Sequence, residues 1–479
     1  MGEHRSEEFD VVVLGGGTGG YSAALRASGL GLRAALVERD LVGGTCLHRG
    51  CIPSKALLHA ASVREAIEDG ARRWGIASQV TRVDAKALGA TRDDIVERNY
   101  RGLLGHLAQE KVALFAGTGR VTSPRTVEVT PVPGGELTAP VELRARRGLV
   151  VATGSRPRQL PGAPADGTLV VTSDEATRSE HLPASVLIVG AGAIGVEFAT
   201  FYRAFGAEVT LVEVLERVLP TEDPDVSREM QRALRRKGVA VLVKARVEEV
   251  EAVGGEVRAV VRGEDGARTI VAERLLSAIG RAPVTEGLGL EEIGVRLERG
   301  YVLPASWERL ETHVPGVHVV GDVLPPPSLA LAHASFAEGL LVAEVLAGRD
   351  PSPISYANVP RATYSLPEAA SVGLTEPEAR ERGMDVVTNR LPLGAIAKGL
   401  IYGEGGMVKL VAERGGPVVG VHLVGPHVTE LIAEGMLITS WEALPLDVAD
   451  LIHPHPSLSE AVGEAHLTLA GRRLHQLPA

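Results

Sequence analysis

The chain contains two cysteines, Cys46 and Cys51, and both lie in the segment GGTCLHRGCIPSK. This close pair in an otherwise cysteine-free chain predicts a redox-active dithiol, because a disulfide closing so short a loop adds little stability. A structural disulfide and two unrelated thiols are the alternatives. In a regular helix, residues i and i+5 have Cα atoms about 8–9 Å apart, whereas a disulfide needs roughly 4.4–6.8 Å. Since a helical pattern starts around Pro53, we expect Cys46 on a distorted turn that leads into that helix.

The same segment holds groups that favour a thiolate, which is the reactive form of cysteine. The N-terminus of the expected helix and the cation of Arg49 would both stabilise the negative charge. We therefore expect Arg49 to shift the balance between thiol and thiolate. A bridge constrained by the turn should also be easier to reduce than a structural disulfide.

A thiol substrate needs a base, and the C-terminal sequence LIHPHPSLSE offers one. His455 and Glu460 are separated by a proline-containing turn that could bring the carboxylate to the imidazole ring. Such a carboxylate fixes the tautomer of the histidine and stabilises its protonated form. His453 is a competing base by the same reasoning, and a surface His–Glu contact without catalysis is the alternative to both.

Two glycine-rich segments predict binding sites for dinucleotides. Each follows a short apolar strand and precedes a helical pattern, which is the context in which G-x-G-x-x-G binds a pyrophosphate. The glycines in this frame are Gly15, Gly17 and Gly20 in the first segment and Gly190, Gly192 and Gly195 in the second. The alternative for either segment is glycine that only allows a helix to pack on a strand.

An acidic residue closes the second strand of each unit, Glu38 in the first and Glu213 in the second. The spacing from first glycine to acid is 23 in both (38 − 15 and 213 − 190). A carboxylate here accepts hydrogen bonds from a ribose 2′-hydroxyl and repels a 2′-phosphate, so Glu213 favours NAD over NADP. Arg217 lies close by in sequence and is a cation that could favour NADP.

Three further apolar strands are expected to end in glycine, in the segments LVVATGSRP, LLSAIGRAP and VHVVGDV. Their glycines are Gly154, Gly280 and Gly321, and a basic residue follows the glycine in the first two segments. Asp322 follows the third and would lie at the carboxyl edge of a parallel sheet, where it could bind a ribityl hydroxyl. A plain turn is the alternative for Asp322.

Length and composition exclude several classes of protein. The 479 residues exceed the roughly 250–300 that one hydrophobic core serves, so about three domains are expected. A net charge of −10 and an aromatic content of 3% argue against nucleic acid as a partner. The sequence has no apolar run of about 18 residues and no targeting segment at its start, so we expect a cytoplasmic protein without membrane contact.

With these motifs in place, the chain resembles the flavin-dependent pyridine nucleotide–disulfide oxidoreductases along nearly its whole length. The redox segment GGTCLHRGCIPSK is similar to that of the family. GGGTGGYSAALRA and GAGAIGVEFA are similar to its FAD and NAD fingerprints, and VVGDV to its second FAD contact. YSLPEAASVGLTE resembles the start of its interface domain, and HPHPSLSE its histidine motif.

The resemblance implies a role for each chemical group of the site. Cys46 would be the interchange thiol that meets the substrate, and Cys51 the thiol beside the flavin. His455 with Glu460 would be the acid–base pair, acting on the active site of the other subunit of a homodimer.

The resemblance also implies the cofactors and the residues that bind them, and it implies no metal. Lys55 and Glu197 resemble an ion pair near the flavin, and His333 would lie along the flavin edge. The residues expected to bind FAD are Gly15, Gly17, Gly20, Glu38, Lys55, Gly154, Asp322 and His333. Those expected to bind NAD are Gly190, Gly192, Gly195, Glu197, Glu213 and Gly280.

The fold class implied is α/β, with two Rossmann-like dinucleotide-binding domains and an α+β C-terminal dimerisation domain. We expect the first part of the FAD-binding domain in residues 1–150, the NAD-binding domain in 151–282, a central FAD-binding part in 283–349, and the interface domain in 350–479. The alternating segments MVKLVAE and PVVGVHLVG, with a helical run from Thr429 to Trp441, predict that antiparallel last domain independently.

The activity implied is the oxidation of protein-bound dihydrolipoyl groups to lipoyl groups, with hydride passed to NAD⁺. The partner would be a lipoyl domain or lipoyl carrier protein of a 2-oxo acid dehydrogenase complex or of the glycine cleavage system. An NADPH-dependent reductase of a low-molecular-weight disulfide, a mercuric-ion reductase and a non-catalytic flavoprotein subunit are the alternatives. The chain departs from many relatives at His48-Arg49 and in the three prolines that follow Asp322.

Overall fold

The computed structural model describes residues 5–403 and 405–476, which divide into two compact units. The first unit comprises the described residues up to Ala56, together with Gly89–Pro157 and Arg281–Tyr356. The second comprises Leu57–Leu88, Arg158–Gly280 and the described residues from Ala357 onward. Each unit is therefore assembled from three separate stretches of chain. The domain boundaries expected at residues 150, 282 and 349 stay predictions.

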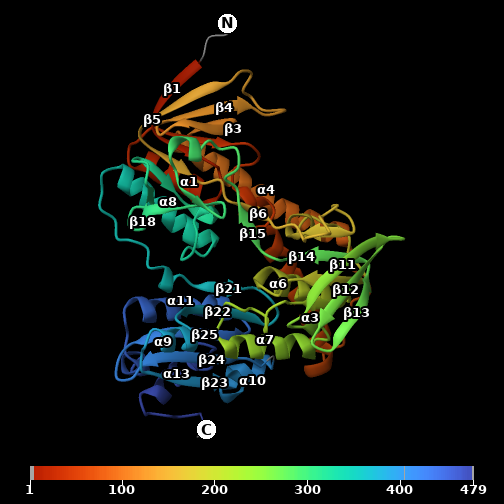
Figure 1. The fold of residues 1–479 in the computed structure, drawn as a ribbon. Helices are drawn as coiled ribbons and strands as arrows, with labels where there is room; N and C mark the ends of the chain where they lie inside the picture. Colours follow the sequence, from red (N-terminus) through yellow and green to blue (C-terminus); the bar gives the residue numbers. More distant parts are fainter. Residues whose placement is uncertain (1–4, 404, 477–479) are drawn as a thin grey trace. The chain divides into compact units, whose positions relative to one another are not determined.

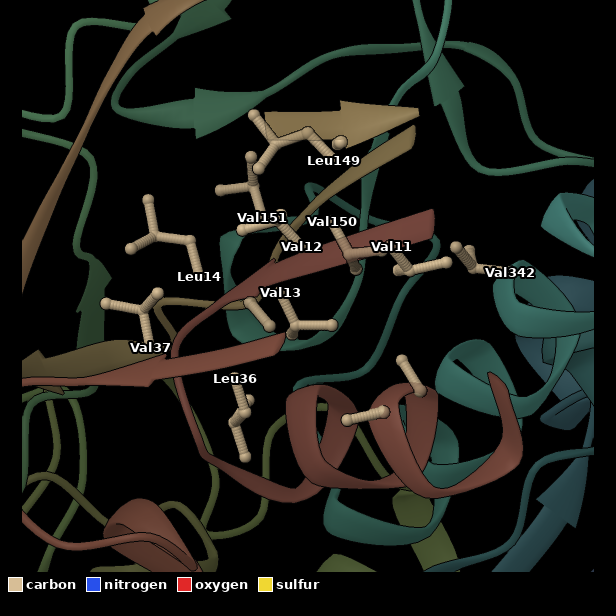
Figure 2. Packing of buried hydrophobic residues seen from close by; sticks show 14 of the residues in the cluster. Val11, Val12, Val13, Leu14, Leu36, Val37, Leu149, Val150, Val151 and Val342 are labelled. Atoms are coloured by element: carbon tan, nitrogen blue, oxygen red, sulfur yellow. The ribbon is translucent and has the colours of Figure 1, made fainter. Parts of the chain in front are cut away.

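A five-stranded parallel layer forms the centre of the first unit, in the order β3–β2–β1–β5–β20 (Figure 1). These strands are β3 (Ala113–Ser123), β2 (Ala34–Glu38), β1 (Arg5–Leu14), β5 (Val141–Val151) and β20 (Val317–Val319). Valine and leucine occupy consecutive positions of β1, because a parallel strand is buried on both faces. Figure 2 shows these side chains packed against those of β2 and β5, and all of them lie in one hydrophobic cluster.

Short strands and helices complete the first unit. β4 (Thr126–Pro131) pairs antiparallel with β3 and β5, and β19 (Glu311–Thr312) and β18 (Pro304–Ser306) extend the sheet beyond β20. α1 (Thr18–Gly29) packs against α8 (Ala332–Leu346). Their backbones approach so closely at Gly339 that a Cβ there would overlap Ser22. This contact fixes the position of α1, including its N-terminus, relative to α8.

The second unit repeats the same arrangement in a five-stranded parallel sheet of order β10–β9–β8–β14–β7. The strands are β10 (Ala240–Leu242), β9 (Glu208–Val212), β8 (Ser185–Val189), β14 (Arg274–Ser277) and β7 (Val170–Thr172). α6 (Ala193–Ala204) follows β8, as α1 follows β1. An antiparallel sheet adjoins, made of β11 (Arg246–Val253), β12 (Glu256–Gly263) and β13 (Gly266–Ala272).

The C-terminal part of the second unit is an antiparallel sheet with helices, as the alternating sequence predicts. Its order is β21–β22–β25–β24–β23, and every pairing is antiparallel. The strands are β21 (Arg361–Thr363), β22 (Glu368–Gly373), β25 (Val418–Gly425), β24 (Met407–Glu413) and β23 (Val386–Pro392). α11 (Val428–Ser440) and α13 (Glu460–Leu469) contribute apolar side chains to the cluster that covers this sheet.

Eight further helices and two strand pairs complete the described secondary structure apart from short 3₁₀ turns. The helices are α2 (Gly44–His48), α3 (Cys51–Arg73), α4 (Ala85–Gln109), α5 (Ser173–Ala176), α7 (Pro224–Arg236), α9 (Glu376–Glu381), α10 (Ala397–Tyr402) and α12 (Pro445–Ala449). The strand pairs are β6 (Ser155–Pro157) with β15 (Arg281–Pro283) and β16 (Leu297–Glu298) with β17 (Tyr301–Val302). Among the residues that the structure describes, none of the helices is both long and apolar enough to cross a membrane.

Several expected boundaries need correction. The helix expected around Pro53 begins at Cys51, and the one expected over Thr429–Trp441 spans Val428–Ser440. The three strands expected to end in glycine stop earlier, at Val151, Ser277 and Val319. Each glycine therefore lies in the loop that follows the sheet, where the left-handed backbone of all three glycines is needed.

A buried lysine holds α7 to the C-terminal sheet within the second unit. Lys409 of β24 has a side chain only 4% exposed, and its Nζ lies 2.9, 2.7 and 2.8 Å from carboxylate oxygens of Asp223, Asp225 and Glu376. Burial lowers the pKa of Lys409, but hydrogen bonds to the three carboxylates outweigh it and the net shift is upward. The same ammonium contributes to holding the pKa of Asp223 below its usual value despite burial.

We predict that Lys409→Met lowers the free energy of unfolding by about 3–5 kcal/mol, because it leaves buried carboxylates without their cation. The cluster's contribution is lost as pH falls through the lowered carboxylate pKa values, and again as pH rises through the raised lysine pKa. Urea unfolding followed by circular dichroism from about pH 2 to about pH 12 measures both effects, because the carboxylate pKa values lie below and the lysine pKa lies above the usual values of these groups. Lys244→Met is the matched control, since the Lys244–Glu264 pair is exposed. An equal loss of stability in the two variants would contradict the prediction.

Candidate active site

The first glycine turn leaves one glycine open to solvent and uses the other two for close backbone contact. Gly15 has φ +104°, and a Cβ there would overlap the carbonyl oxygen of Ala152. A Cβ on Gly20 would overlap the carbonyl oxygen of Gly15. Gly17 has nothing within 4 Å on its Cβ side. Two glycines therefore bring α1 against β1, while the third borders open space.

The second glycine turn has the same geometry in the other unit. Gly190 has φ +101° and approaches the carbonyl oxygen of Ala278, and Gly195 approaches the carbonyl oxygen of Gly190. Gly192 again has nothing within 4 Å. The backbone angles at the N-caps also agree, with φ −69° and ψ −175° at Gly17 and φ −71° and ψ −173° at Gly192.

Both turns expose a helix N-terminus beside the open glycine. Gly17 caps α1 and Gly192 caps α6, and neither helix has a side-chain cap. The first N–H groups of a helix have no partner within the helix, and they carry the positive end of its dipole. Uncapped N–H groups beside the open space at Gly17 and Gly192 fit a pyrophosphate. The two turns therefore suit the predicted FAD and NAD, whose pyrophosphates would need this space.

The acid at the end of β2 is held by two backbone N–H groups. Glu38 accepts a hydrogen bond from the N–H of Gly16 at 2.7 Å and another from the N–H of Asp40 at 2.8 Å. Each oxygen of a carboxylate has two acceptor sites, so both keep capacity for a ribose hydroxyl. The structure thus positions the carboxylate of Glu38 beside the glycine turn. The contact of Glu38 with a ribose stays a prediction.

Glu213 repeats this arrangement at the end of β9. It accepts from the N–H groups of Ala191 at 2.7 Å and Leu215 at 2.9 Å, and it is buried. Arg217 donates instead to the carbonyl of Pro220 at 3.0 Å and pairs with its neighbour Glu216. The cation that could favour a 2′-phosphate is thus engaged within its own turn.

The cysteines lie in two different helices. Cys46 is in α2, Cys51 is the first residue of α3, and only Arg49 and Gly50 separate the two helices. This break is the distortion that the disulfide geometry requires, although Cys46 lies in a short helix of its own and not on an entry turn. No disulfide joins the two residues in the structure, and their side chains are hydrogen-bonded to each other.

The two thiols do not ionise independently. The hydrogen bond with Cys51 and then burial raise the pKa of Cys46, and the negative charge of Cys51 raises it further. The cation that lowers the pKa of Cys46 is Lys55, one turn along α3. Arg49, which we expected to act on the thiolate, forms an ion pair with Asp40. The pair of thiols thus disfavours a second negative charge, so Cys46 stays protonated while hydrogen-bonded to its neighbour.

Tyr21 is a residue of this site that the sequence analysis missed. Burial first, and then the charges of Cys46 and Cys51, raise the pKa of Tyr21 to about 12. The Tyr21 ring lies 5.7 Å from the ring of Phe336 in α8. Tyr21 directly follows the glycine turn in sequence, but no pattern indicates that the first turn of α1 faces the redox segment.

Asp322 belongs to a polar network that also includes the residue next to Cys46. The Ser155 hydroxyl donates to the Asp322 carboxylate, and the Arg281 guanidinium lies 3.9 Å from the same carboxylate. Arg281 also donates to Ser155 Oγ at 2.7 Å and to Thr45 Oγ1 at 3.4 Å. The sequence analysis noted Arg281 as the basic residue after the glycine in LLSAIGRAP. Its contacts with Ser155 and Thr45 could not be predicted, because they depend on the pairing of β6 with β15.

A buried carboxylate positions the loop that carries Asp322. Glu338 of α8 accepts from the N–H of Gly321 at 2.6 Å, the hydroxyl of Ser328 at 2.9 Å and the phenol of Tyr356 at 3.0 Å. Burial raises the pKa of Glu338, although these three donors oppose the shift. Glu338 thus holds both ends of the loop that contains the three prolines. His333 lies at the start of α8, in the same unit.

The histidine pair is formed in the second unit. His455 Nδ1 lies 2.7 Å from Glu460 Oε1, and Glu460 Oε2 accepts from the N–H of Ser457 at 2.7 Å. Burial raises the pKa of Glu460, but the hydrogen bonds from Ser457 and His455 outweigh it and the net shift is downward. The ionised carboxylate places the ring proton on Nδ1, so Nε2 is the basic nitrogen. The His455 side chain is 70% exposed and can reach a substrate.

His453, the competing base, has a different environment. Its Nε2 lies 2.7 Å from Glu434 Oε1, and its side chain is 13% exposed. The hydrogen bond with Glu434 raises the pKa of His453, and a further one to the backbone of Leu451 adds to the shift. A Cβ at Gly463 would lie 2.6 Å from this ring. Both ring nitrogens are occupied, and the geometry favours His455 as the base.

The other predicted binding residues are divided between the two units. Lys55 lies in the first unit and Glu197 in the second, so their expected ion pair stays a prediction. Within the second unit, Glu197 is buried in α6 and accepts from the N–H of Tyr364 at 2.9 Å. Gly154 and Gly280 both have positive φ and open space on the Cβ side.

Comparisons with known protein families identify the family of this chain. The pyridine nucleotide-disulphide oxidoreductase model matches residues 9–339, and the dimerisation domain of the same family matches residues 359–466. The chain belongs to this family. Membership confirms the predicted fold class and the expectation of a flavin- and pyridine-nucleotide-dependent disulfide oxidoreductase.

Relatives of known name are similar over almost the full length. The dihydrolipoyl dehydrogenase of Bacillus subtilis is 41% identical, covering 98% of this chain and 99% of its own. That of Thermus scotoductus is 38% identical at the same coverage. Among solved structures, LpdA of Mycobacterium tuberculosis matches with a TM-score of 0.86 and 27% identity, over 97% of this chain and 99% of LpdA. The flavoprotein disulfide reductase RclA of Escherichia coli matches with a TM-score of 0.83 and 26% identity, over 96% and 99%.

The second glycine turn provides a test that separates packing from ligand binding. Gly195→Ala should lower the melting temperature by several degrees, because its Cβ overlaps the Gly190 carbonyl. Gly192→Ala should leave the melting temperature unchanged, since its backbone angles suit alanine, yet weaken NADH binding about tenfold by filling the cradle. Differential scanning fluorimetry and fluorescence titration with NADH measure the two effects. Unaltered NADH affinity in Gly192→Ala would contradict the assignment of this turn.

Proposed function

We propose that this chain is a dihydrolipoyl dehydrogenase, which oxidises protein-bound dihydrolipoyl groups and passes hydride to NAD⁺. The observation that carries the proposal is the hydrogen-bonded pair Cys46–Cys51 at the break between α2 and α3, in a chain similar to dihydrolipoyl dehydrogenases over nearly its full length. A dithiol substrate and a protein disulfide exchange two electrons without any other reagent.

The exchange begins with the Cys46–Cys51 disulfide. A substrate thiolate attacks Cys46, which forms a bond between substrate sulfur and Cys46 and releases Cys51 as the thiolate. The second substrate thiol then loses its proton and attacks the substrate sulfur that is bonded to Cys46. This attack expels Cys46. The products are a cyclic lipoyl disulfide and a reduced Cys46–Cys51 pair that has gained two electrons. Cys46 leaves as a thiolate and takes up a proton from the protonated base, because its raised pKa favours the thiol form.

His455 supplies the base for this exchange. Its Nε2 accepts the proton of the attacking thiol, while Glu460 holds Nδ1–H and stabilises the imidazolium that results. The ion pair keeps the ring in one orientation, so that the proton can return to the thiol that leaves. We infer that this pair serves the cysteines of a second copy of the chain, in a homodimer formed through the family's dimerisation domain.

The first glycine turn would hold FAD, which would supply the two-electron chemistry that links the reduced cysteine pair to NAD⁺. The chain contributes the uncapped N-terminus of α1, the carboxylate of Glu38 and the network around Asp322 to holding FAD. Glu213 and the engaged side chain of Arg217 favour NAD⁺ at the second turn. The lipoyl group would arrive on a lipoyl domain or lipoyl carrier protein of a multienzyme complex.

A reductase of another disulfide is the second candidate. It is favoured by the similarity to RclA, a flavoprotein disulfide reductase that matches over 96% of this chain. An enzyme of that kind would use the same cysteine pair in the opposite direction and would draw electrons from a reduced pyridine nucleotide. The 41% identity to the Bacillus subtilis dihydrolipoyl dehydrogenase over nearly the full length of both chains makes this reductase the weaker candidate.

We expect the purified enzyme to reduce NAD⁺ rapidly with dihydrolipoamide and to reduce NADP⁺ at least tenfold more slowly. The carboxylate of Glu213 repels a 2′-phosphate, which is the physical reason for the difference. Absorbance at 340 nm measures both reactions in parallel. A preference for NADP⁺ would overturn the role of Glu213. The absence of turnover with either nucleotide would point to the second candidate or to a non-catalytic flavoprotein.

Replacement of His455 by glutamine should lower kcat with dihydrolipoamide by about 10²–10⁴-fold, the usual contribution of a general base. Oxidation of NADH by ferricyanide should change little, because that reaction needs neither the cysteines nor the base. His453→Gln is the matched control and should affect thermal stability more than kcat, since its ring is buried between Glu434 and α13. Equal losses of kcat in the two variants would contradict the assignment.

A further inference from the structure

The two residues that link the cysteine-bearing helices are Arg49 and Gly50, and Arg49 forms an ion pair with Asp40. The pair is partly exposed, with 29% of the Arg49 side chain and 46% of the Asp40 side chain accessible. We propose that the Asp40–Arg49 ion pair is a positioning restraint, which holds the reduced cysteine pair in a geometry ready to close into the disulfide. The inference rests on the redox role proposed for the cysteines, and it is independent of the substrate.

The ion pair closes a ring of contacts around α2. The N–H of Gly16 donates to Glu38, and the same glutamate accepts from the N–H of Asp40. Asp40 then pairs with Arg49, at the end of α2. At the start of α2, the N–H of Gly43 donates to the carbonyl of Gly16 at 2.8 Å, which returns to the first residue of the ring. Both ends of α2 are therefore held to the strand that carries Glu38 and to the glycine turn.

His48, the last residue of α2, makes two further contacts that restrain this end of the helix. His48 Nε2 lies 2.9 Å from the carbonyl of Val42, and its ring lies 5.0 Å from the ring of Tyr100 in an edge-to-face arrangement. Among these contacts, the Asp40–Arg49 pair is the one made by side chains of opposite charge.

The restraint matters only while the cysteines are reduced. In the disulfide form, a covalent bond fixes α2 against the start of α3. In the dithiol form, the distance between Cys46 and Cys51 depends on how α2 is held, and every added freedom lowers the effective concentration of one thiol at the other. The ion pair therefore favours closure, and its loss makes the disulfide easier to reduce.

The test is the equilibrium between the holoenzyme and a dithiothreitol buffer under anaerobic conditions. Two cysteine thiols and oxidised dithiothreitol yield the protein disulfide and reduced dithiothreitol, with two electrons and two protons transferred to the reagent. Acid quenching, alkylation of free thiols and mass spectrometry of the Cys46–Cys51 peptide measure the closure constant. We expect Arg49→Val and Asp40→Asn each to lower this constant two- to fivefold, because a partly exposed ion pair is a weak restraint.

The double variant Asp40→Asn/Arg49→Val should show no larger decrease than either single variant, since both remove the same contact. Arg39→Val is the matched control: Arg39 is exposed on the same turn, and the described part of the chain shows no ion pair for it. Arg49→Lys should restore part of the effect, and salt at about 1 M should weaken closure in the natural protein but not in the double variant.

The inference would be overturned by unchanged closure in both single variants, by additive decreases in the double variant, or by an equal decrease in Arg39→Val. A decrease accompanied by a large fall in melting temperature in every variant would also reject it, in favour of a general loss of structure. If the natural protein forms no Cys46–Cys51 disulfide at any dithiothreitol ratio, the proposed function fails as well. That outcome is distinct from unchanged closure in the variants.

Discussion

The close approach of backbone to backbone at the two glycine turns is the constraint on which the rest of the structure depends. At Gly20 and Gly195, the first turn of a helix lies against the carbonyl of the glycine that follows the preceding strand. Any side chain there would push the helix away from the sheet. With the helix in place, its uncapped N-terminus faces an open cradle, and the next strand delivers a carboxylate to the same point. The cysteine segment then packs on the first turn through the hydrogen bond from Gly43 to Gly16.

The predictions that succeeded from sequence were those that depend on local spacing. The equal distances from Gly15 to Glu38 and from Gly190 to Glu213 correspond to turns with nearly identical backbone angles. The separation of Cys46 and Cys51 was incompatible with a disulfide in one regular helix, and the structure breaks the helix between them. In these cases the geometry is determined by a short stretch of chain, so tertiary packing changes it little.

The missed residues depend on contacts between distant segments. Tyr21 is near the cysteines because α1 and the redox segment meet at the glycine turn. Arg281 reaches Thr45 because β15 pairs with β6, more than a hundred residues away in sequence. The ion pair of Arg49 with Asp40 was not predicted, nor was the effect of Lys55, which lowers the pKa of Cys46. The expected effect of Arg49 on the thiolate stays a prediction. Side-chain partners of this kind follow from the fold and not from the spacing of a motif.

The composition of each unit from three separate stretches has a consequence for synthesis on the ribosome. β20 completes the parallel layer of the first unit, yet it pairs with β5, which leaves the ribosome more than 160 residues earlier. During that interval the edge of β5 has unpaired N–H and C=O groups, which are a template for incorrect pairing. The intervening residues 158–280 belong to the other unit. The nascent chain must therefore fold much of one unit while the other still lacks an edge, a situation in which chaperones are commonly needed.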